Sequence, residues 1–147
     1  MKKEIAVFWF RRDLRLEDNH GLYHALNSGL PVLPVFIFDK HILEKLEDKK
    51  DKRVEFIHFA LSNINDELKK LNSSILVLHD RPLDAFKKIS KKYLIKAVFT
   101  NHDYEPYAMQ RDKEMGDYFR SINTPFQTFK DQVIFEKAEV VKADAVS

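Results

Sequence analysis

Short apolar runs alternate along the chain with longer segments in which apolar residues recur every three or four positions. The first run, Ile5 to Phe10, has six apolar residues rich in β-branched and aromatic side chains, which is typical of a strand buried on both faces. Further runs lie at 32–38, 75–78, 97–100 and 126–129. This alternation predicts an α/β fold, a Rossmann-like, doubly wound, five-stranded parallel sheet with flanking helices.

Helices are expected between these strands. The apolar positions that indicate them are Leu22, Ala25 and Leu26; Val54, Ile57, Leu61, Ile64, Leu68 and Leu71; Leu83, Phe86 and Ile89; and the segment from Tyr107 to Ser121. Asp18 or Asn19 is expected to cap the first helix and Gly29 to end it, and Pro82 suits a helix start. The charge-dense stretch 41–52 is interpreted mainly as a loop.

Composition narrows the class of protein. A length of 147 residues suits one domain. With 25 basic and 23 acidic residues, the net charge of +2 makes no case for nucleic-acid binding by the chain as a whole. The lack of cysteine excludes disulfides and a thiol nucleophile and agrees with a cytoplasmic location, which we expect. The longest apolar run, 30–38, is far shorter than the roughly 20 residues of a membrane span.

Candidate site residues should follow the strands, because doubly wound sheets bind ligands at the carboxyl ends of their strands. The segments in these positions are 11–15, 39–40, 79–81 and 101–105. The three glycines form neither a dinucleotide-binding fingerprint nor a P-loop. His20 and His24 are four residues apart and could reach one metal, but no third ligand has suggestive spacing. We predict no metal site and no catalytic residue in this chain.

The segment Trp9-Phe10-Arg11-Arg12-Asp13-Leu14-Arg15-Leu16-Glu17-Asp18-Asn19 closely resembles the opening of the photolyase/cryptochrome family. The resemblance continues through 34–39, Arg53 with Phe56 and Leu61, 101–107 with Arg111-Asp112, and 129–134. It covers residues 5 to about 144. The chain is thus identified as similar to the N-terminal α/β domain, the antenna domain, of a deoxyribodipyrimidine photolyase.

The resemblance implies a domain at 1–137 and the start of an interdomain connector at 138–147. In the family, a helical domain follows that holds FAD, the electron-transfer tryptophans and the lesion cleft. We expect this C-terminal domain to be absent from these 147 residues. It would be the partner of this domain in the parent protein, which would bind damaged DNA. The chain alone is expected to bind little DNA, to contact no membrane and to lack catalytic activity.

The family's N-terminal domain typically holds a light-harvesting pigment. Matching positions imply that Asp103 and Glu105 hold the ring of a flavin or deazaflavin, such as FMN or 8-hydroxydeazaflavin, and that Arg53 lies near its tail. Phe36, Ile37 and Phe38, with the strand-ending Asp39, would supply backbone and apolar wall. Without the resemblance, Asp103 and Glu105 would be interpreted as caps of the next helix.

Three functions remain open from the sequence. The first is the antenna domain of a light-dependent repair lyase that splits pyrimidine dimers. The alternatives are the same domain of a cryptochrome-type blue-light photosensor, and a free-standing nucleotide- or pigment-binding module. A folate antenna is disfavoured, because Tyr107-Ala108 stand where the folate-binding branch places an Asn-Glu pair.

Overall fold

The computed structural model describes residues 2–11, 14–39, 52–103 and 106–130, and at 52–54 and 106–107 it describes the backbone alone. Within these residues, strands and helices alternate along the chain. The elements are β1 (Lys3–Phe10), α1 (His20–Leu26), β2 (Val32–Phe38), α3 (Lys52–Lys69), β3 (Leu76–His79), α4 (Pro82–Lys92), β4 (Tyr93–Asn101), α5 (Pro106–Ser121) and β5 (Phe126–Phe129). All five predicted strands and all four predicted helices are present.

The five strands form one parallel sheet in the order β3-β2-β1-β4-β5. The chain therefore builds outward from β1 in one direction and then, through α4, crosses over to build outward on the other side. The strand order reverses between β1 and β4, where Trp9 lies opposite Thr100. This confirms the predicted doubly wound sheet, and it places the switch point at the centre of the sheet.

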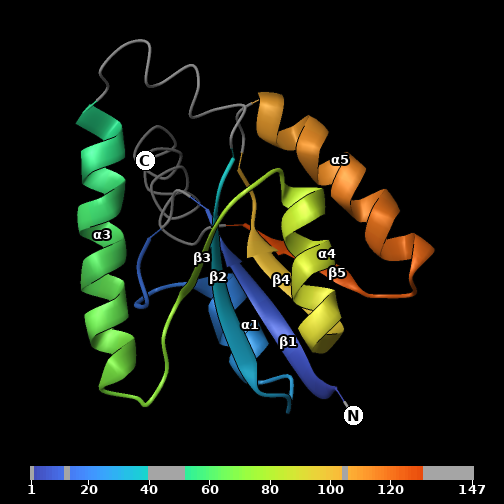
Figure 1. Ribbon diagram of the computed structural model, residues 1–147, viewed down its shortest axis with the longest axis horizontal. Coiled ribbons are helices and arrows are strands. Elements are labelled where there is room, and N and C mark those ends of the chain that lie inside the picture. Colours follow the sequence, from blue (N-terminus) through green and yellow to red (C-terminus); the bar gives the residue numbers. More distant parts are fainter. Residues whose placement is uncertain (1, 12–13, 40–51, 104–105, 131–147) are drawn as a thin grey trace, which may run out of the picture.

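Two hydrophobic cores lie on the two faces of the sheet, and β1 contributes alternate residues to each. Ala6, Phe8 and Phe10 pack with residues of α1 and α3 on one face. Ile5, Val7 and Trp9 pack with residues of α4 and α5 on the other face. Figure 1 shows α3 on one side of the sheet and both α4 and α5 on the opposite side. Residues 5–10 are buried without alternation because both faces of the sheet are covered.

The ends of two helices differ from the sequence prediction. Leu26 is the last residue of α1 and is 64% exposed, and Leu71 lies beyond the end of α3 and is 71% exposed. Leu26 lies within α1 as predicted, although its side chain is exposed, whereas the prediction that α3 extends to Leu71 is wrong. Asn72 explains the end of α3, because its positive φ of 60° turns the chain away from the helix. The cap of α1 is Asn19, whose side chain accepts a hydrogen bond from the Leu22 amide.

In the part of the chain that the structure describes, none of the helices has the length and apolar character needed to cross a bilayer.

Candidate functional site at the carboxyl edge of the sheet

Two ion pairs join α5 to the ends of β1 and β2. Arg11, the first residue after β1, pairs with Asp112. Asp39, the first residue after β2, lies with its Oδ2 2.6 Å from Nη2 of Arg111. Arg11 and Asp39 are only 8% and 9% exposed. Charge-assisted hydrogen bonds at buried positions are strong, and removal of one partner is costly. The two pairs therefore hold the first half of α5 against this edge.

The Arg11 side chain also connects the two strands at the switch point. Its Nε donates to Thr100 Oγ1 at 3.1 Å, and Thr100 Oγ1 donates to the carbonyl of Trp9 at 2.7 Å. The guanidinium carbon lies 4.3 Å from the centroid of the Trp9 ring, at the distance of a cation–π contact. A buried cation is thus fixed between β1, β4 and α5, where the strand order reverses.

Asn101, at the end of β4, joins this edge to the start of α1. It is 1% exposed, accepts a hydrogen bond from the Gly21 amide at 2.8 Å and donates to Asn19 Oδ1 at 2.7 Å. A Cβ atom on Gly21 would lie 2.8 Å from Asn101 Oδ1 and 3.2 Å from the Thr100 carbonyl carbon. The absence of a side chain at Gly21 therefore permits the close approach of α1 to β4.

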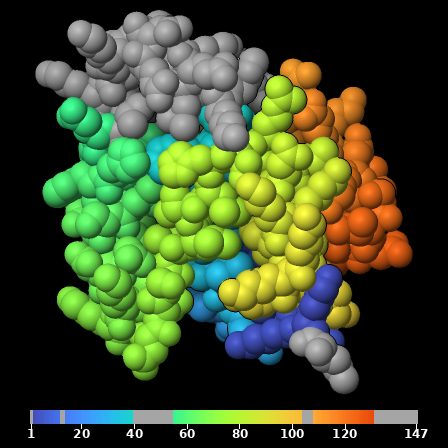
Figure 2. Space-filling view, in the orientation of Figure 1, coloured from blue at the N-terminus to red at the C-terminus, as the bar shows by residue number. Residues whose placement is uncertain are grey.

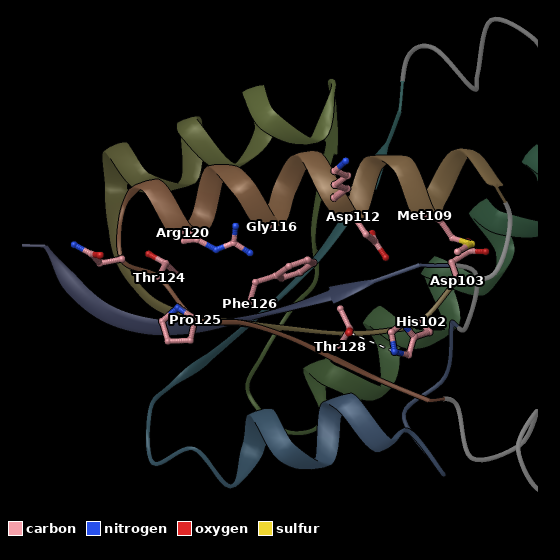
Figure 3. A pocket seen from close by; sticks show the side chains of 12 residues that line it. His102, Asp103, Met109, Asp112, Gly116, Arg120, Thr124, Pro125, Phe126 and Thr128 are labelled. Carbon is pink, nitrogen blue, oxygen red and sulfur yellow. Dashed lines mark hydrogen bonds between the residues drawn. The ribbon is translucent and has the colours of Figure 1, made fainter.

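A groove of about 770 Å³ runs between α5 and the edge strand β5. Five residues of α5, from Met109 to Arg120, face it. Its lining residues are His102, Asp103, Met109, Asp112, Lys113, Gly116, Arg120, Asn123, Thr124, Pro125, Phe126 and Thr128. Figure 3 shows Asp103 and His102 at one end with Met109 and Asp112 above them, and Phe126 below the middle of α5. The groove offers carboxylates, cations and an aromatic ring to a ligand.

Asp103 is the predicted site residue that the structure places in this groove. It is half-buried and lies two residues after the end of β4. His102, its neighbour, is held by its amide, which donates to the Phe129 carbonyl at 2.7 Å. Arg53 lies in the first turn of α3, with its side chain outside the described residues, and Glu105 lies wholly outside them.

The predicted residues on β2 lie two strands away from β4 and do not line the groove. Phe36 and Phe38 belong to the core on the α1 and α3 face, and Ile37 belongs to the core on the other face. The ring of Phe38 stacks on His79 with centroids 4.7 Å apart. These three side chains therefore fill the interior, and what they present at the edge is mainly backbone. Asp39 reaches α5 through Arg111.

The two histidines of α1 contact each other and β5. Their Nε2 atoms lie 3.1 Å apart, and the His24 ring stacks on Phe129 with a centroid distance of 4.3 Å. No group of three or more His, Cys, Asp or Glu side chains suited to a metal ion occurs among the described residues. The pair is therefore interpreted as part of the packing between α1 and β5.

Comparison with known proteins gives a consistent set of similarities. A family model described as DNA photolyase matches residues 6–146. Deoxyribodipyrimidine photo-lyase of Synechococcus sp. is 27% identical over 135 residues, which are 92% of this chain and 28% of that protein. The (6-4)DNA photolyase of Arabidopsis thaliana is 25% identical over 145 residues, with coverage of 93% and 26%. The chain thus spans little more than a quarter of each of these two relatives.

A solved structure shares the fold. The archaeal photolyase from Sulfolobus tokodaii, described with two FAD molecules and as implying a novel light-harvesting cofactor, is 29% identical, with a TM-score of 0.71. The match covers 86% of this chain and 29% of that one.

Proposed function

The chain belongs to the DNA photolyase family, and on that premise we propose that it is the N-terminal, light-harvesting domain of a light-dependent DNA repair photolyase. Its role would be to hold a second pigment, and the repair chemistry would belong to a helical FAD domain of the same protein. The observation that carries the proposal is the position of Asp103, which follows β4 next to the switch point and lines the groove beside α5.

The residues of the groove suit a flavin or deazaflavin. Its volume of about 770 Å³ falls in the range of about 300–1,000 Å³ that small-molecule sites occupy. The Asp103 carboxylate can accept hydrogen bonds from ring N–H groups, and Phe126 offers an aromatic surface. Lys113 and Arg120 could meet a phosphate group. When bound, the pigment would absorb light and pass its excitation to FAD.

Other residues are proposed for this site by their match to the family. Glu105 would hold the ring together with Asp103, and Arg53 would assist the tail. Asp39 and the backbone of residues 36–38 would form the part of the site at the carboxyl end of β2. The second cofactor of the archaeal relative supports a flavin-type pigment, because that photolyase is described with two FAD molecules.

The partner proposed for this domain is the helical FAD domain of its parent protein. The two photolyase relatives are between three and four times as long as the matched region, which leaves room for such a domain. On α3, Phe56 and Phe59 are 68% and 66% exposed and lie one turn apart. Exposed aromatic surface of this kind is typical of surfaces that become buried against another domain.

Titration of FMN and of a deazaflavin into the 147-residue chain tests the pigment site. Loss of a hydrogen-bonded carboxylate should cost about 1–3 kcal/mol, or roughly 5- to 150-fold in affinity. Asp103→Ala should therefore weaken binding by that factor in equilibrium dialysis, and circular dichroism should show that the variant is folded. Asp66→Ala, an exposed change of the same kind on α3, is the matched control.

Equal affinity of the wild type, Asp103→Ala and Asp66→Ala would remove Asp103 from the site. Binding of a folate, without binding of either flavin, would overturn the assignment of the pigment.

A further inference from the structure

The outward surface of α4 carries a dense group of lysines on the side of the sheet opposite α3. Lys87, Lys88, Lys91 and Lys92 are all exposed, and they form two rows along the helix. The opposite face of the same helix is buried through Pro82, Ala85, Phe86 and Ile89. This separation of a charged face from an apolar face is typical of an amphipathic helix that packs on a sheet.

A fifth lysine from the start of the chain joins this group. Lys2 is exposed, and its Nζ donates to the carbonyl of Ser90 in α4 at 2.7 Å. Figure 2 shows the N-terminal residues, in blue, against the yellow C-terminal end of α4. We call these five residues, Lys2, Lys87, Lys88, Lys91 and Lys92, the α4 lysine surface.

Little of this charge is neutralised by neighbouring carboxylates. Lys88 pairs with Asp80 at 2.8 Å, and Asp84 lies in the first turn of α4. Among the residues that the structure describes, Lys87, Lys91 and Lys92 form no salt bridge. Five lysines and two carboxylates leave a local charge of about three, which exceeds the net charge of +2 of the whole chain. This surface therefore carries a local excess of positive charge.

Helix stability alone accounts for only part of the pattern. Lys91 and Lys92 lie in the last turn of α4, where cations interact favourably with the helix dipole. Lys87 and Lys88 lie a full turn earlier, where that effect has faded. A solubilising surface would also be expected to mix both signs of charge, as the whole chain does with 25 basic and 23 acidic residues.

We propose that the α4 lysine surface contacts the phosphate backbone of DNA, weakly and without sequence preference. Successive lysines in one row are about 6 Å apart along the helix axis, and a DNA strand presents a phosphate about every 3.4 Å of its own axis. Membrane binding is disfavoured because the apolar face of α4 is buried against the sheet, and only Leu83 of its large apolar residues is exposed. This surface lies outside the pigment groove and does not depend on pigment binding.

Filter binding of an undamaged duplex of about 20 base pairs to the 147-residue chain, between about 50 and 200 mM salt, tests the proposal. The logarithm of the association constant should fall linearly with the logarithm of the salt concentration. Each lysine–phosphate contact adds about 0.9 to the steepness of that line. The double variant Lys87→Gln, Lys91→Gln should therefore reduce the slope by about 1.8.

The matched control is Lys69→Gln, Lys70→Gln, which removes the same charge from exposed positions at the end of α3, on the other side of the sheet. This control should leave the slope unchanged, and circular dichroism should show both variants folded. An equal reduction of the salt-dependence slope in both double variants would overturn the proposal. The absence of DNA binding by the wild type at the lowest salt concentration would also overturn it. Tighter binding to phosphatidylserine vesicles than to DNA would overturn the choice of partner. The Lys87→Gln, Lys91→Gln variant should keep the flavin affinity of the wild type. A loss of DNA binding in this variant is then independent of the pigment site.

Discussion

Gly21 has no space for a side chain, since its α-carbon faces Asn101, Phe8 and the backbone of Thr100. A Cβ atom at this position would approach Asn101 Oδ1 and Phe8 Cε1 within 2.8 and 2.9 Å. Relief of such contacts would require α1 to move away from β4, which would break the buried hydrogen bonds of Asn101. The carboxyl edge therefore depends on a glycine that does not itself line the groove.

Gly21→Ala should lower the free energy of unfolding by about 1–3 kcal/mol, as overpacking does in tightly packed interiors. Gly116→Ala is the matched control, because a Cβ there would meet only Phe126 Cδ2 at an ordinary 3.8 Å. In the middle of α5, that change should raise stability by up to about 1 kcal/mol. Urea unfolding of both variants measures the difference, and a loss of similar size in both would contradict the steric explanation.

Asparagine, instead of the more usual glycine, reverses the chain direction after α3 and α5. Asn72 and Asn123 have positive φ values of 60° and 57°. After each of them, the next amide bonds back into the helix: Ser73 donates to Leu68 O at 2.9 Å and Thr124 donates to Phe119 O at 2.8 Å. Asparagine tolerates this left-handed conformation better than other residues that have a Cβ.

Asn72→Val should therefore destabilise the protein by about 1–2 kcal/mol, the cost of a left-handed conformation for a residue with a bulky Cβ. Asn72→Gly should be neutral or stabilising. Ser74→Val, at an exposed position that is not left-handed, serves as the control and should change little. Thermal unfolding of the three variants would disprove this account if Asn72→Gly were as damaging as Asn72→Val.

The strands were the most predictable elements, and the helix ends were the least. Apolar runs such as Ile5 to Phe10 are easily recognised as strands. Both faces of the sheet are covered, so apolar residues do not have to alternate with polar ones. The apolar pattern of α3 continues to Leu71, two residues beyond the last helical residue, Lys69, and the left-handed conformation of Asn72 ends the helix. Local periodicity predicts an element, but turn conformation decides where it stops.

The candidate site was predictable only in its strand-following residues. The rule that ligands bind at the carboxyl ends of parallel strands led to the segment 101–105, and the resemblance to the family singled out Asp103, which the structure places beside the groove. The pairing of Arg11 with Asp112 spans 101 positions in the sequence. No spacing rule relates residues so far apart, because their contact exists only after the sheet has formed. The same holds for the pair of Asp39 with Arg111.

For the molecule as a whole, we expect pigment binding and repair to reside in different parts of the parent protein. The 147-residue chain, illuminated with DNA that contains pyrimidine dimers, should restore no pyrimidines, because the resemblance places FAD and the lesion cleft in the helical domain. The full-length parent, assayed in parallel by chromatography of the digested DNA, should restore them. Light-dependent repair by the short chain would refute this division, and a parent without repair activity would favour a photosensor.

The position of Trp9, beneath Arg11 at the switch point, has a spectroscopic consequence. Trp9 is the only tryptophan of the chain and is 3% exposed, directly below the switch point. Its ultraviolet emission is therefore a single, unambiguous signal from the layer beneath the proposed pigment. A flavin at the edge absorbs in the range where a buried indole emits, so its arrival should quench Trp9 by resonance energy transfer. The protein thus carries its own fluorescent donor next to its candidate acceptor, and occupancy of the edge can be followed without a label.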